Sequence, residues 1–298
     1  MLIDSVLNAI GNTPLIRLTK ISSGNIFAKA EFLNPGGSIK DRVGKYIIEC
    51  AERDGTLKPG MTIIEATSGN TGIGLALVGR QKGYRVTCVM PGNMSVERKK
   101  IIEAFGGEII YTPAEESLSG SLKKMREITG KDSEQYFVVN QFSNPYNPEI
   151  HYLQTAPEIW EDSNGEIDIF VAGVGSGGTL QGIGTYLKEK NPSIRIVAVE
   201  PKNSAALLGR EPGLHQIHGI GDGFVPAVLD VKLVDMVFTV SDEEAIETTR
   251  RLSKEEGLLL GTSSGANVFA ALHMDNGRNR VVTILPDRAE RYFSTALI

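Results

Sequence analysis

The sequence is poor in cysteine, lacks long apolar runs and has no excess of positive charge, and each absence excludes a class of protein. Only two of its 298 residues are cysteines, Cys50 and Cys88, which are too few for a disulfide framework and have no partner at zinc-site spacing. No apolar run approaches the roughly 18 residues that a membrane-spanning helix needs, and the N-terminus lacks the basic segment of a secretory signal. With 31 basic and 36 acidic residues the net charge is −5, so we expect no binding to nucleic acid or to an anionic membrane. The four histidines also lack metal-site spacing. We expect a soluble cytoplasmic protein without a metal ion.

Glycine, by contrast, is abundant, with 33 residues in a chain whose apolar (41%) and charged (22%) fractions are those of a globular protein. Excess glycine without a short repeat is typical of tight turns and of loops where the backbone approaches a ligand. The glycine-rich segments are therefore the first places to look for a site.

Short β-branched runs alternate with helical segments along the chain. The expected strands are Ile26–Ala30, Thr62–Ala66, Arg85–Pro91, Glu108–Thr112, Tyr136–Asn140, Ile167–Gly173, Ile194–Glu200, Val237–Val240 and Val281–Pro286. The expected helices include Asp41–Arg53, Thr71–Lys82, Val96–Phe105, Leu118–Thr129 and Thr179–Lys190, with a capping box at Ser241–Glu244 opening another. Strands separated by such helices form parallel sheets covered on both faces. We predict an α/β fold.

A glycine-rich loop follows one of the predicted strands. Residues 173–178 read Gly-Val-Gly-Ser-Gly-Gly, which matches G-x-G-x-x-G, and Glu200 lies 22 residues beyond Gly178, where a dinucleotide-binding fold places its ribose-binding acid. An NAD-dependent oxidoreductase is one interpretation. Glycines also let backbone N–H groups close on a phosphate at a helix N-terminus, whatever the phosphate is attached to. The loop therefore indicates phosphate and leaves the rest of the ligand open.

Two more loops and one lysine have a similar setting. Thr67-Ser-Gly-Asn-Thr-Gly72 joins a strand to a helix and suits a carboxylate, although an ordinary capping turn explains it equally well. Gly261-Thr-Ser-Ser-Gly265 also enters a helix, so one cleft for a phosphate, a carboxylate and a polar ring atom is indicated. Lys40 begins a helix after the turn of NPGGS, where the helix dipole and burial would lower the pKa of its amine, as Schiff-base chemistry requires. The alternative is a solvated lysine.

Together these motifs resemble one family. NPGGSIKDR, TSGNTG, QFSNPYNP, GVGSGGT and GTSSGA occur in the order and spacing of the cysteine synthases, and the match runs from GNTPL near Gly11 to ERYFSTALI at the C-terminus. This is the O-acetylserine sulfhydrylase and cystathionine β-synthase group of pyridoxal-phosphate (PLP) enzymes with the tryptophan-synthase-β fold (fold type II). The resemblance implies two α/β domains with mainly parallel sheets covered by helices and PLP in the cleft between them. Residues 35–145 would form a smaller mobile domain with the TSGNTG loop, and residues 1–34 and 146–298 a larger one with the phosphate loop, joined near the turn-rich segment 144–148.

The resemblance also implies a role for each matching residue. Lys40 would hold PLP as a Schiff base and move the α-proton of the substrate, Asn70 would hydrogen-bond the ring hydroxyl, and Ser263 would meet the pyridine nitrogen. The phosphate would lie against Gly175, Ser176, Gly177, Gly178 and Thr179. The substrate carboxylate would be bound by Thr67, Ser68, Thr71 and Gln141.

The implied activity is β-replacement on a small amino acid through an α-aminoacrylate intermediate. For a cysteine synthase, O-acetyl-L-serine and sulfide give L-cysteine and acetate. The resemblance also implies a homodimer, since family members are usually homodimers, and it implies serine acetyltransferase as a partner, since some members bind the C-terminus of that enzyme in the active-site cleft.

One residue departs from the family pattern. Asp222, in Gly-Ile-Gly-Asp-Gly-Phe from Gly219, stands where the family usually has a small apolar residue or a tyrosine. If its side chain faces the site, it repels hydrosulfide and accepts a proton from water. The enzyme would then be a cysteine hydroxyl-lyase that converts L-cysteine and water to L-serine and hydrogen sulfide. If it faces solvent, it is a turn residue between glycines.

Overall fold

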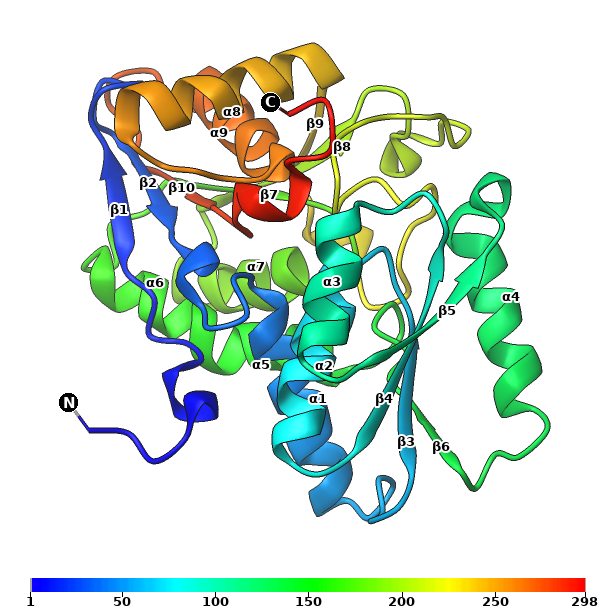
Figure 1. Ribbon diagram of the computed structural model, residues 1–298. Coiled ribbons are helices and arrows are strands. Elements are labelled where there is room, and N and C mark those ends of the chain that lie inside the picture. The colour runs from blue at the N-terminus through cyan, green and yellow to red at the C-terminus, as the bar shows by residue number, and fades with distance from the viewer. Residues whose placement is uncertain (1, 298) are drawn as a thin grey trace.

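The computed structural model describes residues 2–297, and within them the chain forms two β-sheets that are both flanked by helices (Figure 1). The larger sheet has six strands in the order β1-β2-β10-β7-β8-β9. These strands are β1 (Leu15–Leu18), β2 (Ile26–Lys29), β7 (Ile169–Gly173), β8 (Arg195–Pro201), β9 (Met236–Val240) and β10 (Val281–Ile284). The smaller sheet has the order β5-β4-β3-β6, with β3 (Thr62–Ala66), β4 (Arg85–Pro91), β5 (Glu108–Thr112) and β6 (Tyr136–Val138).

All the strand pairs are parallel among the described residues except β1 with β2, which is antiparallel. The predicted α/β fold with mainly parallel sheets is therefore confirmed. The predicted strands are all present, with ends within two residues of those expected. The short strand β1 was not expected; it is too short to show a clear alternation of apolar and polar residues.

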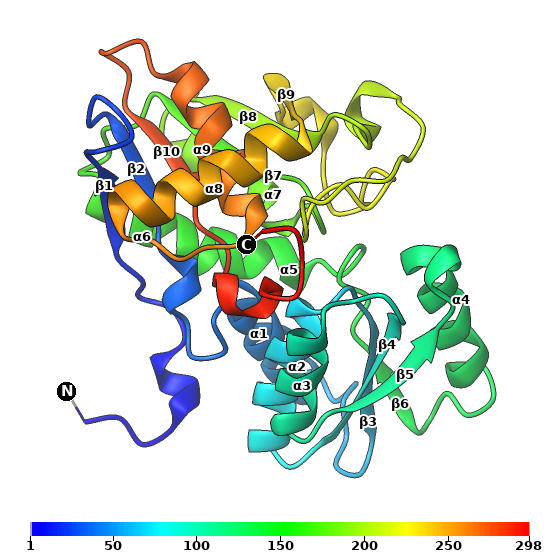
Figure 2. The ribbon, with the colours of Figure 1, turned by 45° about the horizontal axis from the view of Figure 1, so that its top comes forward.

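Helices cover both faces of each sheet, as βαβ crossovers require. They are α1 (Lys40–Arg53), α2 (Asn70–Gln81), α3 (Val96–Ala104), α4 (Ser117–Thr129), α5 (Tyr146–Ile150), α6 (Ala156–Asp162), α7 (Gly178–Lys190), α8 (Asp242–Glu256) and α9 (Thr262–Met274). The capping box that opens α8 at Ser241 is present. Helices α8 and α9 pack on one face of the larger sheet and α6 and α7 on the other, and α4 lies on the face of the smaller sheet opposite α1 and α2 (Figures 1 and 2).

The strands of the smaller sheet all fall within the predicted segment 35–145, whose domain boundaries and mobility stay predictions. Near its C-terminal limit, α5 continues into a π-helical turn, His151–Thr155, and then into α6. Single π-helical turns inside α-helices often occur near functional sites. The final residues fold back from β10 as a 3₁₀ turn, Ala289–Tyr292, which lies against the start of α3 (Figures 1 and 2).

A buried cluster of charged side chains anchors the helix that carries Lys40. The Arg42 guanidinium donates to both oxygens of Glu31, at 2.8 Å each, and to Glu158 on α6 at 2.6 and 2.7 Å. Burial by itself would raise the pKa of the Glu31 carboxyl, but the Arg42 charge and the hydrogen bonds hold it below its usual value. These hydrogen bonds join the start of α1 to Glu31, just after β2, and to α6. Separating the helix from them would leave buried charges unpaired, which is costly.

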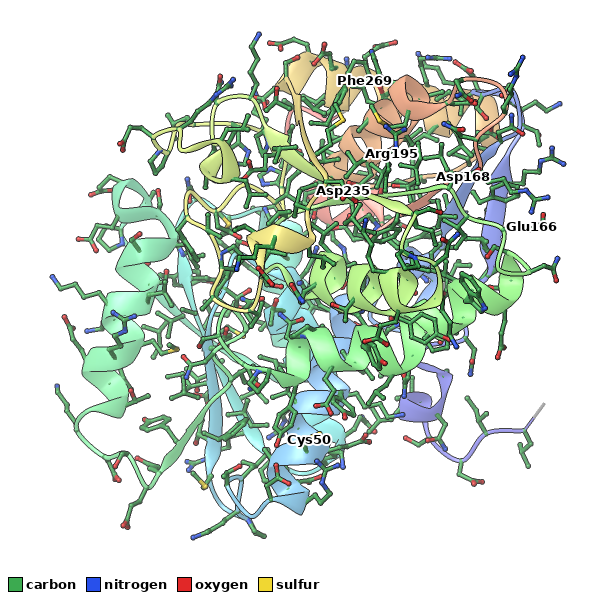
Figure 3. All side chains as sticks on the ribbon, turned by 180° about the vertical axis from the view of Figure 1, so that it is seen from behind. Cys50, Glu166, Asp168, Arg195, Asp235 and Phe269 are labelled. Atoms are coloured by element: carbon green, nitrogen blue, oxygen red, sulfur yellow. The ribbon has the colours of Figure 1, made fainter. Side chains whose placement is uncertain are left out.

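Both cysteines are buried and unbridged, and Cys50 lies on α1 (Figure 3). No helix in the described part of the chain is long and apolar enough to cross a membrane. Among residues 2–297 there is also no group of three or more His, Cys, Asp and Glu side chains arranged to hold a metal ion.

Candidate active site

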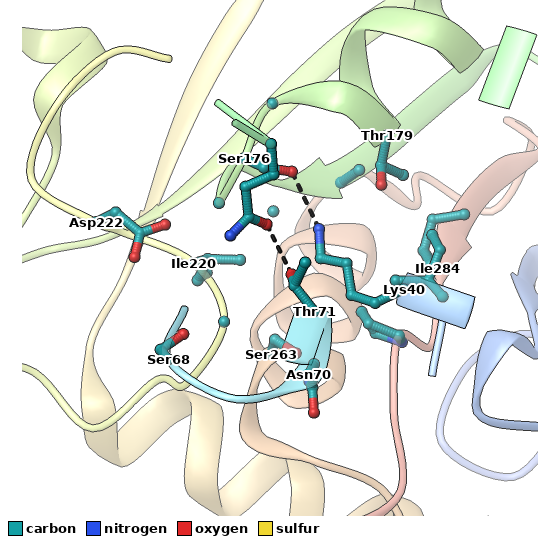
Figure 4. Close-up of a pocket in the computed structure, with 18 of the residues that line it drawn as sticks. Lys40, Ser68, Asn70, Thr71, Ser176, Thr179, Ile220, Asp222, Ser263 and Ile284 are labelled. Carbon is teal, nitrogen blue, oxygen red and sulfur yellow. Dashed lines mark hydrogen bonds between the residues drawn. The ribbon is translucent and has the colours of Figure 1, made fainter. Parts of the chain in front are cut away.

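The carboxyl ends of β3, β7 and β10 lead into loops that border one cavity between the two sheets (Figure 4). Ligands of open α/β sheets bind at this end of the strands. The cavity comprises about 830 Å³ of space, part of which opens to solvent. Eleven of the residues predicted for the site line it: Lys40, Ser68, Asn70, Thr71, Gln141, Gly175, Ser176, Gly177, Thr179, Asp222 and Ser263. Thr67 and Gly178 do not line the cavity.

Lys40 is the first residue of α1 and projects its amine into the cavity (Figure 4). Its Nζ donates to Ser176 Oγ at 3.0 Å. Burial lowers the pKa of the Lys40 amine to about 8, against the opposing effects of the Asp222 and Glu65 carboxylates. A substantial fraction of this amine is therefore neutral near pH 8, which is the form that attacks a carbonyl group.

The loop after β7 presents free backbone donors at the start of α7. From Gly175 to Thr179, the N–H groups donate no hydrogen bond to any of residues 2–297. A Cβ atom on Gly175 would lie 2.2 Å from the Gly219 carbonyl oxygen, and Gly177 has a positive φ of 82°. Only glycine permits this close approach and this conformation. Consecutive free N–H groups at the positive end of a helix dipole fit a phosphate.

A phosphate cradle, an amine of lowered pKa and the Ser263 hydroxyl at the start of α9 all border the same cavity. This donor set fits PLP, which carries a phosphate, an aldehyde and a ring nitrogen. The fit rests on the free N–H groups in particular, because no other part of the described chain satisfies them.

The loop after β3 is shaped by side chains. The Thr67 hydroxyl accepts from the Gly69 N–H at 3.0 Å, so Thr67 shapes the loop from beneath the cavity surface. Thr71 Oγ1 donates to Gln141 Oε1 at 2.7 Å (Figure 4). Arg98, which is 2% exposed, donates from Nη1 to the Ser68 carbonyl oxygen at 2.8 Å. The loop is therefore held to α3 and to the segment after β6.

Asn70 joins this loop to the C-terminal segment. Its Nδ2 donates to Asp287 Oδ2 at 2.6 Å and to the Tyr292 hydroxyl at 3.3 Å, while its Oδ1 accepts from Arg291 at 2.7 Å. Both hydrogens of Nδ2 are used in these contacts, so a ring hydroxyl that accepts from Nδ2 would have to replace one of them. The Tyr292 ring also stacks on His218, with ring centroids 5.2 Å apart.

Asp222 faces the cavity, with its carboxyl group directed toward the side on which Lys40 lies (Figure 4). Both flanking glycines have positive φ values, 75° at Gly221 and 86° at Gly223. Burial raises the pKa of the Asp222 carboxyl, and the nearby Lys40 charge opposes that shift. The inward orientation, left open by the sequence, is the one found.

Glu200, the acid that would bind the ribose in a dinucleotide site, is already hydrogen-bonded within the protein. Both oxygens of Glu200, which is 3% exposed, accept the Leu207 N–H at 3.1 Å. Glu200 does not line the cavity. The G-x-G-x-x-G loop therefore lacks the ribose partner that an NAD site would need.

Several residues of the site were missed because their sequence context is ordinary. Glu65 lies inside an apolar strand, where its oxygens accept the N–H groups of Asn140 at 2.8 Å and Gln141 at 3.1 Å. Burial raises the pKa of Glu65 to about 7. Asp287 follows β10, and its position beyond the carboxyl end of a parallel strand was the one available signal. Arg98 and Asn147 carried no signal, because one is a single charge on a helix and the other looks like a turn residue.

Comparisons with known proteins show which family and which solved structures this chain is similar to. A family model described as "Pyridoxal-phosphate dependent enzyme" matches residues 6–287. Cysteine synthase A of Escherichia coli strain K12 is 49% identical over 300 residues, covering 97% of this chain and 93% of the relative. The crystal structure of a cysteine synthase from Entamoeba histolytica superposes with a TM-score of 0.95 at 42% identity, covering 100% of this chain and 91% of that one. A structure of a hydrogen sulfide-producing enzyme from Fusobacterium nucleatum has a TM-score of 0.94 at 41% identity, covering 98% of this chain and 100% of that one.

Proposed function

The chain belongs to the family of pyridoxal-phosphate-dependent enzymes, and from that premise we propose that it is a cysteine synthase, which converts O-acetyl-L-serine and sulfide to L-cysteine and acetate. The observation that carries the proposal is the position of Lys40. Its amine, with a pKa near 8, lies in one cavity with a phosphate cradle and with the loop that suits a carboxylate. When bound, PLP supplies an electrophilic carbonyl and a ring that stabilises negative charge at the substrate α-carbon.

In this proposal the chain's own residues bind, orient and move protons. Gly175 to Thr179 hold the phosphate, Ser263 meets the ring nitrogen and Asn70 contacts the ring hydroxyl. Ser68, Thr71 and Gln141 bind the substrate carboxylate, and Thr67 keeps their loop in shape. Lys40 holds the cofactor and transfers the α-proton, a role that a buried amine with a pKa near 8 performs well at neutral to mildly basic pH.

A specific observation favours a second activity, that of a cysteine hydroxyl-lyase. The carboxyl group of Asp222 faces the cavity, where a carboxylate repels hydrosulfide and accepts a proton from water. Sulfide would leave the β-carbon of L-cysteine first and water would add in its place after giving its proton to Asp222, so that L-cysteine and water give L-serine and hydrogen sulfide. The similarity to a hydrogen sulfide-producing enzyme supports this alternative.

A product assay separates the two activities. Wild type and Asp222→Asn are each given L-cysteine alone, and separately O-acetyl-L-serine with sulfide. Sulfide and L-serine from wild type but not from the variant would identify the lyase and the role of Asp222. Rapid cysteine formation without cysteine breakdown would identify the synthase. Absence of turnover in both assays, with PLP never bound, would contradict the whole proposal.

The proposal extends to the setting of the enzyme. Residues 35–145 form the mobile domain, which closes over the bound carboxylate and moves the 67–72 loop. The enzyme is cytoplasmic and a homodimer, and its cleft binds the C-terminus of serine acetyltransferase. Sedimentation analysis measures the oligomeric state, and titration with a peptide of that C-terminal sequence, competed by O-acetyl-L-serine, tests the partner.

A further inference from the structure

Asn147, at the start of α5, connects two parts of the site although it does not line the cavity. Its side chain is fully buried. Its Nδ2 donates to the Gln141 carbonyl oxygen at 2.8 Å and to Ser176 Oγ at 3.0 Å. The amide therefore spans from the residue assigned to the substrate carboxylate to the loop assigned to the phosphate.

The orientation of this amide follows from its neighbours. A carbonyl oxygen can only accept, so the nitrogen of Asn147 must face Gln141. The two hydrogens of Nδ2 then serve Gln141 and Ser176, one each. Asn147 Oδ1 accepts no hydrogen bond from residues 2–297, and it faces Gly178, where a Cβ atom would lie 2.1 Å away. The absence of a side chain at Gly178 is what leaves room for the amide.

The hydroxyl of Ser176 is constrained in turn. A hydroxyl has one hydrogen to donate and two lone pairs that accept. Both neighbours of Ser176 Oγ, Asn147 Nδ2 and Lys40 Nζ, are donors, each at 3.0 Å. While the Lys40 amine is protonated and can only donate, the hydrogen of Ser176 is therefore left over, and it has no acceptor among the described residues. Ser176 borders the cavity amid free N–H groups that also need an acceptor.

We propose that Asn147 is a positioning residue that, by donating to Ser176 Oγ, directs the Ser176 hydroxyl hydrogen to a phosphate oxygen of the cofactor. This inference rests on the proposed function, since it assumes that PLP binds in the cavity. The donation from Asn147 is independent of the protonation of Lys40, so it persists when the lysine amine is neutral. Asn147 acts on the phosphate alone and not on the ring or the aldehyde.

The test compares two cofactors that differ only in the phosphate. The full-length protein is freed of cofactor, and dissociation constants for PLP and for pyridoxal are measured by absorbance titration. In Asn147→Asp the side chain keeps its shape but accepts the Ser176 hydrogen instead of donating. Because hydrogen bonds to charged groups are the strong class, PLP affinity should fall about 10- to 100-fold, whereas pyridoxal affinity should change less than about twofold.

Asn144→Asp is the matched control. Asn144 lies in the same turn and donates to the Val139 carbonyl oxygen at 2.9 Å, and it has no hydrogen bond to Ser176. The Asn144→Asp variant should bind PLP and pyridoxal with the affinities of the wild type. Equal weakening of PLP and pyridoxal binding in Asn147→Asp would overturn the proposal, because a general distortion of the site affects both. Wild-type protein that binds neither cofactor would instead contradict the proposed function.

A double-mutant cycle tests whether Asn147 acts through Ser176. Asn147→Ala should weaken PLP binding in the wild-type background but change it less than about twofold in Ser176→Ala, where no hydroxyl remains to be oriented. The same penalty in both backgrounds would contradict the proposal. The thermal unfolding midpoint of each variant shows that the comparison is made between folded proteins, and if Asn147→Ala does not fold, Asn147→Asp is used in the cycle.

Discussion

The loops after β7 and β3 begin alike but are held in different ways. Each leaves the carboxyl end of a parallel strand and enters the N-terminus of a helix, α7 in one case and α2 in the other. The loop after β7 is confined by backbone and by rigid neighbours: Gly175 lies against the Gly219 carbonyl, and Gly177 packs against Pro226.

The loop after β3 is held mainly by side-chain hydrogen bonds. Arg98 donates to the Ser68 carbonyl, Thr71 to Gln141, and Asn70 contacts the C-terminal segment. Side-chain bonds of this kind can exchange for bonds to a ligand, whereas a backbone packed against another backbone cannot shift alone. The same strand–loop–helix unit can therefore give a rigid loop, which suits the proposed phosphate site, and an adjustable loop, which suits the proposed carboxylate site.

The largest expected effect lies at Lys40, between the two loops. Lys40→Ala should lower the turnover rate by about 10³-fold, because the chain loses both its cofactor-binding amine and its proton carrier. The visible absorption of covalently held cofactor should disappear as well. Lys45→Ala, on the same helix but bonded to the Leu7 carbonyl, should retain both. An active, coloured Lys40→Ala enzyme would show that the amine has no part in the reaction.

Substituting alanine for one glycine in each loop tests directly whether the two loops differ in rigidity and in function. Gly175→Ala places a Cβ 2.2 Å from the Gly219 carbonyl oxygen, and Gly69→Ala places one 2.4 Å from Arg98 Cδ at a backbone φ of 140°. Forced repacking of this kind costs about 1–3 kcal/mol. Gly175→Ala should weaken PLP binding by about tenfold or more, whereas Gly69→Ala should mainly raise KM for the amino acid. Equivalent losses of both quantities in both variants would remove the distinction between the loops.

Removing the Thr71 hydroxyl tests the adjustable loop more gently. Thr71→Val deletes its 2.7 Å hydrogen bond to Gln141 with little change in shape. The loss of a hydrogen bond worth about 1 kcal/mol should raise KM for the amino acid about fivefold. Titration should show unchanged affinity for PLP. If the cofactor affinity falls instead, the two loops are not separable in function.

The smallest expected effect concerns the charge of Asp222, which lines the same cavity as the two loops. The Asp222 carboxylate raises the pKa of the Lys40 amine against the larger opposing effect of burial. In Asp222→Asn the pKa of Lys40 should therefore lie below about 8, and more of the amine is neutral at a given pH. The rate at which PLP binds covalently to cofactor-free protein rises with pH through the pKa of Lys40, so in the variant this rise should occur at lower pH. An unchanged pH for this rise would mean that the carboxyl is neutral or remote from the amine, and a rise at higher pH would contradict the predicted direction.

Local patterns in the sequence were sufficient to predict much of this architecture. Strands such as Thr62–Ala66 and Arg85–Pro91 were predicted at their observed ends, since β-branched runs between glycine-rich turns have a strong local signal. The cavity-lining position of the glycine loop was predicted from its entry into a helix, and that of Lys40 from the resemblance to the cysteine synthases. The partners of these residues were not: Asn147 and Ser176 are 29 positions apart, and Asn70 and Asp287 are 217 apart.

The α/β class and the order of the elements could be predicted from the sequence alone, because they depend on propensity and periodicity over a few residues, and the ligands of the loops could be predicted from their motifs. The three-dimensional packing was needed to show that Asp222 faces the cavity, that Thr67 lies beneath it and that Asn147 donates a hydrogen bond to Ser176. Side-chain direction between two glycines and contacts between distant segments depend on how the two sheets pack together. That packing is a sum of many long-range contacts, none of which has a pattern in the local sequence.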